Sequence, residues 1–176
     1  MKTAFLIFLV AIYTISCVDQ KSNKPSESSS PEGKTVFYFI RHAEKDRSNP
    51  ENQDPHLNSA GLERAQKWKE ELKEVNFDAI YTTDFNRTRE TAGPLANHND
   101  LELSLYDPAI MNDPNFVKEN SGKTVLIVGH SNTTPMFVNA ILGEEKYPHM
   151  DDDNNADLYI VTIENGKISD ELRKVN

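Results

Sequence analysis

Two histidines stand at the ends of the two most apolar segments of this chain. His42 ends the run VFYFIRH, residues 36–42, and His130 ends the run KTVLIVGH, residues 123–130. Each run has the length and the β-branched and aromatic content of a strand that is buried on both faces. In open α/β sheets, ligands bind at the carboxyl ends of the strands. We therefore expect both imidazoles at one edge of a sheet, facing one pocket.

Two arginines accompany these histidines. Arg41 directly precedes His42, and Arg87 follows another predicted strand in the first turns of a helix. Arginine stays charged and carries a rigid fork of donors, so two arginines can hold a phosphoryl group bidentately. Neutral histidine is nucleophilic, with an ordinary pKa of about 6.5. The four residues predict a phosphate site with a nucleophile mounted at the end of a rigid strand.

The elements that must position these residues alternate along the chain. The sequence predicts strands at 35–40, 77–82, 101–106 and 123–130, and helices at 57–75, 86–98, 114–120 and 134–143. Gly93-Pro94 is expected to kink or interrupt the second helix. Asn165-Gly166 predicts a hairpin of two strands within 156–175. This alternation predicts an α/β fold with a three-layer, largely parallel sheet and helices on both faces.

Four motifs resemble the histidine phosphatase superfamily, also called the phosphoglycerate mutase-like family. They are RHAEK at 41–45, LNSAGLERA at 57–65, TTDFNRTRETA at 82–92 and GHS at 129–131. Their order and spacing are similar to the family's over roughly residues 35–142. The resemblance implies a phosphoglycerate mutase-like fold and a phosphohydrolase of the histidine acid phosphatase type. Such an enzyme hydrolyses a phosphomonoester or a phosphoamidate through a phosphohistidine intermediate.

The resemblance also implies roles for the site residues. His42 would be the nucleophile, and Arg41, Arg87 and His130 would bind the phosphoryl oxygens and stabilise the transition state. No metal or cofactor is implied, because the cationic side chains take that place. Ala43 stands where many members have glycine, as in the small phosphohistidine phosphatases. The stretch between Arg87 and His130 is short for the lid insertion of the mutases, which favours an open, hydrolytic site.

Two carboxyl groups are candidates for the acid that protonates the leaving group. Asp107 follows the predicted strand 101–106 and would lie at the same sheet edge as His42. In many family members the acid comes from this region of the chain. Asp107 can equally well be a residue that starts a loop before Pro108. Glu44, two residues past the nucleophile, is the alternative acid.

Two other functions remain open on the sequence alone. A catalytically silent module could bind a phosphorylated ligand in the same cradle, although binding alone would not require a nucleophile. A phosphomutase would need the missing insertion. Residues 149–155, HMDDDNN, lack the glycine turn and the distant glutamate of a calcium loop, so we interpret them as a solvated acidic loop.

Composition limits the partners. The chain has 28 acidic and 19 basic residues and a formal net charge of −9, which argues against a nucleic-acid binder. The expected partner is a phosphorylated small molecule or a phosphoprotein. A single cysteine, Cys17, excludes an internal disulfide.

The N-terminal residues resemble a bacterial lipoprotein signal. Lys2 gives a positive start, and the apolar run 4–15 is shorter than the roughly 20 residues of a transmembrane helix. Ser16 before Cys17 suits a cleavage site at which Cys17 becomes the lipidated N-terminus; an ordinary export signal with an incidental cysteine is the alternative. We therefore predict a signal peptide at 1–17 and a lipid anchor on Cys17 in the bacterial cell envelope.

Between this signal and the folded part lies a polar segment. Residues 18–34 are rich in serine and proline, which predicts a flexible tether. The phosphatase domain would then occupy residues 35–176.

Overall fold

The computed structural model describes residues 33–109 and 113–175. Its strands are β1 (Thr35–Arg41), β2 (Ala79–Thr82), β3 (Leu103–Leu105), β4 (Thr124–Gly129), β5 (Asp157–Glu164) and β6 (Lys167–Lys174). Its helices are α1 (Ser59–Leu72), α2 (Asn86–His98), α3 (Pro114–Glu119) and α4 (Thr133–Leu142). The predicted signal peptide with Cys17, and nearly all of the predicted tether, lie outside the described residues.

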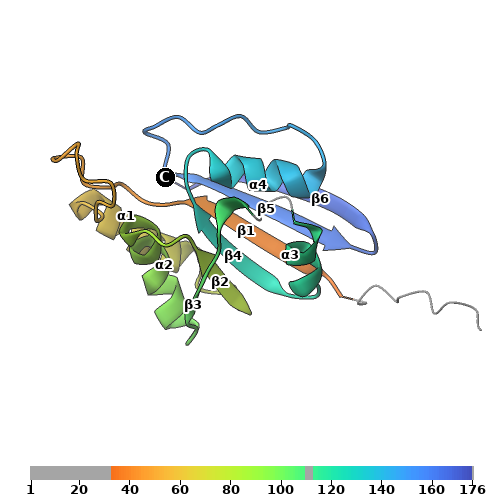
Figure 1. The fold of residues 1–176 in the computed structure, drawn as a ribbon. Coiled ribbons are helices and arrows are strands. Elements are labelled where there is room, and N and C mark those ends of the chain that lie inside the picture. The colour runs from red at the N-terminus through yellow and green to blue at the C-terminus, as the bar shows by residue number, and fades with distance from the viewer. Residues whose placement is uncertain (1–32, 110–112, 176) are drawn as a thin grey trace, which may run out of the picture.

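All six strands form one sheet in the order β3-β2-β4-β1-β5-β6 (Figure 1). The four strands from β3 to β1 are parallel to one another. β5 is antiparallel to β1, and β6 is antiparallel to β5. The predicted α/β fold with a largely parallel sheet is confirmed. In the described part of the chain, every helix is too short or too polar to cross a membrane.

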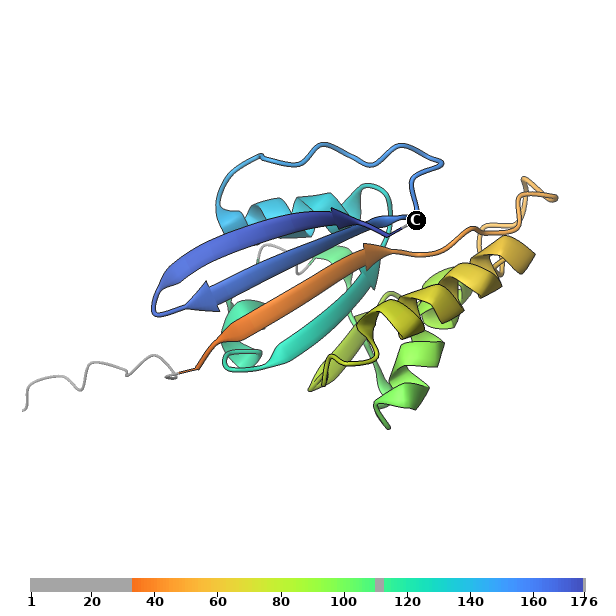
Figure 2. The ribbon, with the colours of Figure 1, turned by 180° about the vertical axis from the view of Figure 1, so that it is seen from behind.

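Alternating side chains of the central strands divide the core into two layers. Phe37 and Phe39 of β1 belong to a buried cluster with Phe137 of α4. Ile40 of β1 belongs to a second cluster, with Trp68 of α1. Figure 2 shows α1 and α2 together on one side of the sheet and α4 on the other. Both faces are therefore covered, as the continuous apolar runs predict.

Local signals account for several element ends. Asn58 caps α1, because its side-chain oxygen accepts a hydrogen bond from Gly61 N. Gly143 follows α4 with a φ of 73°, in the left-handed conformation that favours glycine at a helix end. Asn165 and Gly166 have φ values of 52° and 72°, as a two-residue hairpin turn requires.

The expected interruption of α2 is wrong. α2 runs from Asn86 to His98 as one helix and includes Pro94. Proline cannot donate the hydrogen bond to the carbonyl of Glu90, which costs helix stability. Ala92 and Leu95 on either side are fully buried in the core, and this packing keeps the helix continuous.

Strand register brings the predicted site residues to one edge. β1 and β4 are neighbours, and Arg41 pairs with Gly129 at their carboxyl ends. β2 lies on the other side of β4 and leads into α2, which carries Arg87 in its first turn. His42, His130 and Arg87 therefore follow three adjacent strand ends, as the sequence predicts.

Candidate active site

The His42 side chain is held in one tautomer. His42 is 4% exposed, and its Nδ1 lies 2.7 Å from the carbonyl oxygen of Ala43. A carbonyl only accepts hydrogen bonds, so Nδ1 carries the proton and Nε2 has a free lone pair. The backbone is fixed as well, because His42 N donates to Gly129 O and the His42 carbonyl accepts from Asn155 Nδ2 at 2.7 Å.

The surroundings also keep His42 neutral. Burial lowers the pKa of His42 to about 3, and the positive charge of Arg41 and the neighbouring His130 and Arg87 add to this effect. The hydrogen bond to the Ala43 carbonyl acts in the opposite direction and is outweighed. At neutral pH the imidazole is therefore uncharged, with a lone pair on Nε2, which is the form that can attack phosphorus.

His130 lies beside His42. The two imidazole ring centroids are 5.4 Å apart, with the rings edge to face. His130 Nε2 is hydrogen-bonded to Thr83 Oγ1 at 3.0 Å, and burial, followed by the charges of Arg87 and Arg41, lowers the pKa of His130 to about 4. His130 is thus neutral at pH 7, with its ring orientation set by Thr83 just after β2.

The guanidinium of Arg87 is buried with unused donors. Its side chain is 11% exposed and stacks over the Phe85 ring at 4.3 Å from the centroid. Arg87 Nη1 lies 3.6 Å from Asp54 Oδ1, an ion pair without a hydrogen bond. Within residues 33–109 and 113–175, neither Nε nor Nη1 has a hydrogen-bond partner. Buried donors are normally satisfied, so these atoms indicate a place for an anion.

Arg41 differs from the expectation of a free bidentate fork. Its Nη1 donates to the carbonyl oxygens of Asp151, Asp152 and Asn154, and its Nη2 donates to Asp152 Oδ1 at 3.2 Å. Among the described residues, its buried Nε has no hydrogen-bond partner. The loop before β5 therefore holds this guanidinium, and Nε is the donor left for a ligand.

The aspartates of this loop, residues 151–153, are exposed, as expected for a solvated acidic loop, but other parts of the loop contact the site. Asp152 is exposed at its side chain, but the loop backbone supplies three acceptors to Arg41, and Asn155 is buried against His42. The acceptors are mainly backbone carbonyls, which carry no signal in the side-chain sequence. In the described part of the chain, no group of three or more His, Cys, Asp or Glu side chains could hold a metal ion.

The two candidate acids occupy different surroundings. Glu44 Oε1 accepts a hydrogen bond from Arg64 Nε at 2.7 Å, so a protein cation already engages this carboxylate. Asp107 is exposed, and its Oδ1 accepts from Ala109 N, as in a residue that starts a turn. Glu44 lines the cavity beside His42, and Asp107 is not among that cavity's lining residues.

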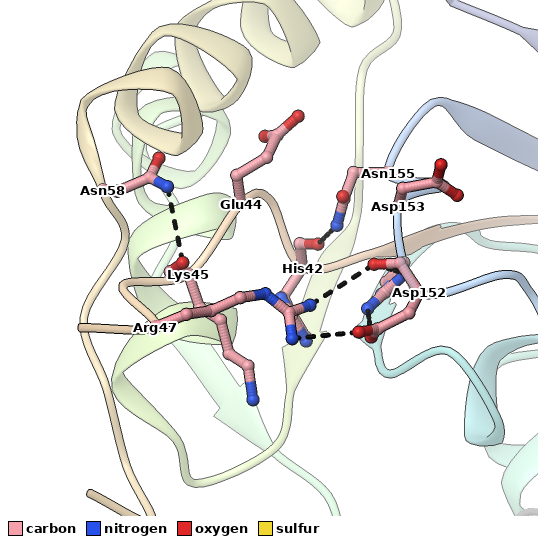
Figure 3. A pocket seen from close by; sticks show the side chains of 9 residues that line it. His42, Glu44, Lys45, Arg47, Asn58, Asp152, Asp153 and Asn155 are labelled. Atoms are coloured by element: carbon pink, nitrogen blue, oxygen red, sulfur yellow. Dashed lines mark hydrogen bonds and ion pairs between the residues drawn. The ribbon is translucent and has the colours of Figure 1, made fainter. Parts of the chain in front are cut away.

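A cavity of about 550 Å³ opens beside His42 (Figure 3). Lys45 and Arg47, from the segment after β1, line one part of it, and Asp152 and Asn155, from the loop before β5, line another. The cavity is polar and charged on both sides. It offers space for the part of a substrate that lies beyond the phosphoryl group.

Sequence reasoning missed several residues of the site. Thr83 lies directly after β2, inside the motif 82–92, so its position at the sheet edge is a usable signal. Asp54 lies shortly before the motif 57–65, and Asn155 ends the segment 149–155. The residue types alone do not indicate that Asp54 contacts Arg87 or that Asn155 contacts His42.

Comparison with known families agrees with this geometry. Residues 37–111 match the model of the histidine phosphatase superfamily (branch 1). This range includes the motifs around His42 and Arg87 and ends before His130. A comparison with curated protein sequences finds no match.

Solved structures share the fold at low sequence identity. Phosphoserine phosphatase from Entamoeba histolytica, in complex with 3-phosphoglyceric acid, has a TM-score of 0.64 at 16% identity, covering 81% of this chain and 98% of its own. Phosphoglycerate mutase from Bacillus anthracis has a TM-score of 0.63 at 15% identity, covering 81% and 93%. A structure from Agrobacterium tumefaciens, assigned as the phosphohistidine phosphatase SixA, has a TM-score of 0.56 at 19% identity, covering 81% and 96%.

At these identities the solved structures establish the fold of this chain as phosphoglycerate mutase-like. The family match adds the motif residues around His42 and Arg87. Together they support a phosphohydrolase enzyme in which residues 37–111 are similar to the histidine phosphatase superfamily.

Proposed function

We propose that this protein hydrolyses a phosphomonoester or a phosphoamidate through a phosphohistidine intermediate on His42, without a metal ion. The observation that carries the proposal is the protonation state of His42 together with the buried donors of the nearby arginines. A neutral imidazole with a free Nε2 lies in a buried setting near arginine donors that have no partner among the described residues. A nucleophile beside buried donors that can bind an anion is the arrangement that phosphoryl transfer to histidine requires.

In the first step, His42 Nε2 attacks the phosphorus atom. The P–N bond forms as the bond from phosphorus to the leaving oxygen or nitrogen breaks, and the leaving group takes the electron pair and a proton. Arg87 Nε and Nη1 and Arg41 Nε would donate to the phosphoryl oxygens, where negative charge is held in the transition state. His130, beside the ring of His42, would complete the cradle.

In the second step, water attacks the phosphorus atom. The P–N bond breaks, its electron pair returns to His42 Nε2, and the water gives a proton to the group that acted as acid in the first step as inorganic phosphate forms. The Ala43 carbonyl keeps the proton on Nδ1 through both steps, so the same tautomer is restored for the next turnover. For oxygen leaving groups, Asp107 is the proposed acid of the first step and Glu44 the alternative.

A panel of phosphorylated compounds tests this function. The purified protein should hydrolyse a generic aryl phosphate in excess chelator, and His42→Ala should abolish turnover. His98→Ala, at the exposed end of α2, is the matched control and should keep full activity. Near wild-type activity in His42→Ala, or activity that EDTA removes and a divalent metal restores, would overturn the proposal.

We also propose that the mature protein is anchored in the cell envelope by lipid on Cys17. The support is the sequence alone: the apolar run 4–15 and the position of the only cysteine directly after it. Two or more acyl chains give stable anchoring. The protein should partition with membranes, and Cys17→Ser should leave it unlipidated. Mass spectrometry that finds an unmodified N-terminus at or after residue 17 would contradict this.

A further inference from the structure

Two cations in the cavity beside His42 have no role in the steps described above. Lys45 and Arg47 both follow β1 and line the cavity. Lys45 is half-buried, and within the described ranges no carboxylate lies within ion-pair distance of its Nζ. Burial lowers the pKa of Lys45, and the nearby charges of Arg87 and Arg47 lower it further, although the charge of Asp152 acts in the opposite direction. An anion placed here would relieve that repulsion.

Arg47 is paired, but only through an exposed contact. Its Nη1 lies 2.9 Å from Asp152 Oδ2, and the two side chains are 54% and 75% exposed. Exposed ion pairs contribute little to stability, so a ligand anion can replace this one. In Figure 3 the pair reaches across the cavity from the segment after β1 to the loop before β5.

The same carboxylate also contacts Arg41. Asp152 Oδ1 accepts from Arg41 Nη2, while Oδ2 faces Arg47. Asp152 therefore occupies the position between two arginines that an anionic group of a ligand would fit. The other cavity carboxylate on this side, Glu44, is engaged by Arg64 and does not neutralise Lys45 or Arg47.

We propose that Lys45 and Arg47 form a subsite for a second anionic group on the leaving-group side of the substrate. The preferred substrate class is then a phosphorylated compound that carries a carboxylate or another anion near its phosphoryl group. Without ligand, Arg47 is ion-paired with Asp152; when the second anion binds, it replaces Asp152 as the partner of Arg47. This inference rests on the proposed phosphatase function.

A matched set of three substrates tests the subsite. Phenyl phosphate is compared with meta- and para-carboxyphenyl phosphate, and the ratio of their kcat/KM values is the readout. At low salt we expect the better of the two carboxylated esters to have a kcat/KM about tenfold higher than that of phenyl phosphate, because its carboxylate makes charge-assisted contacts. The preference should decrease as salt is added, because the subsite is partly exposed.

Variants assign the preference to particular residues. Lys45→Met and Arg47→Gln should each bring the ratio toward one, whereas Asp152→Asn should raise it, because Arg47 loses its competing carboxylate and Arg41 keeps an oxygen acceptor. Lys118→Met on α3 and Arg173→Gln on β6 make the same changes at exposed positions. These two controls should keep the wild-type ratio.

A binding measurement separates this inference from the proposed function. Phenylphosphonate and the carboxyphenylphosphonates cannot be hydrolysed, so calorimetry on the wild-type protein measures the same preference without turnover. If phenyl phosphate is not hydrolysed, the phosphatase proposal fails and the phosphonate ratio still decides the subsite. Equal affinities for the phosphonates, or a preference that Lys45→Met and Arg47→Gln leave unchanged, would overturn the subsite.

Discussion

At the scale of single residues, hydrogen bonds and charges set the reactivity of each functional group. His42 suits the proposed role of nucleophile because the Ala43 carbonyl fixes its tautomer and burial keeps it neutral. Arg87 suits the proposed role of anion binder because its buried Nε and Nη1 have no hydrogen-bond partner within the described ranges. These states could not be predicted from residue types, since they depend on neighbours brought together by the fold.

The first residue-scale prediction concerns pH. Burial lowers the pKa values of His42 and His130 to about 3 and about 4, and protonation of His42 would remove its lone pair. Activity that depends on the neutral forms is therefore present above these values and lost below them. After correction for the ionisation of the substrate phosphate, kcat/KM should be constant between about pH 7 and 5 and fall below about 4. An enzyme group that titrates near the ordinary histidine value of about 6.5 would contradict this.

The second prediction separates two arginines of α2. Arg87→Ala should raise KM and lower kcat, with a loss in kcat/KM of roughly 10²–10³, because donors to the transition state are removed. Arg89→Ala is the matched control, since Arg89 is more exposed and pairs with Asp84. It should change kcat/KM by less than about twofold. Equal losses of kcat/KM for an aryl phosphate in the two variants would show that Arg87 has no special role.

The third prediction concerns the proton donor. If Asp107 is the acid, Asp107→Asn should slow hydrolysis of alkyl phosphates by roughly 10²–10⁴ and barely affect p-nitrophenyl phosphate, whose leaving group needs little protonation. Equal slowing of both substrates would mean a structural role, which its hydrogen bond with Ala109 N would explain. If neither substrate is slowed, the same comparison with Glu44→Gln tests the alternative acid. The weaker, uncharged hydrogen bond from Arg64 to the amide oxygen is then part of the effect.

At the scale of elements, α1 packs closely against the segment that carries the nucleophile. A Cβ built on Gly61 would lie 2.2 Å from the carbonyl oxygen of Glu44, which is a backbone atom that cannot rotate away. Glycine at this position lets the start of α1 contact the residues after His42. The helix thereby supports the segment between β1 and the cavity.

A pair of alanine substitutions tests this close approach. Gly61→Ala should lower the free energy of unfolding by about 1–3 kcal/mol or more, because the backbone of either segment must shift. Gly93→Ala on α2 meets no other part of the chain within 4 Å. Its gain in helix propensity is opposed by the following Pro94, so its effect should stay within about 1 kcal/mol. Urea denaturation measures both, and equal stabilities of the two variants would contradict the packing argument.

The strands, helices and site edge could largely be predicted because their signals are local. Continuous apolar runs give β1 and β4, and Asn165-Gly166 gives the hairpin of β5 and β6. The hydrogen bonds from Arg41 to the loop before β5 could not be predicted, because their acceptors are backbone carbonyls. The continuity of α2 through Pro94 depends on burial that only the tertiary structure provides.

At the scale of the whole molecule, a strongly acidic chain concentrates cations at one sheet edge. The net charge is −9, yet Arg41, Lys45, Arg47 and Arg87 lie around His42. Three parallel strands and two loops contribute to this arrangement. The edge of the parallel sheet is thus the structural basis for the proposed mechanism, in which His42 carries the phosphoryl group between substrate and water.

The stereochemical course of hydrolysis tests this central claim most directly. The substrate is a thiophosphate ester made chiral at phosphorus by oxygen isotopes, hydrolysed in isotopically labelled water. Transfer to His42 and then to water involves two in-line displacements, each with inversion, so the product should show net retention of configuration at phosphorus. Net inversion would show a single direct attack by water and would contradict a phosphohistidine intermediate.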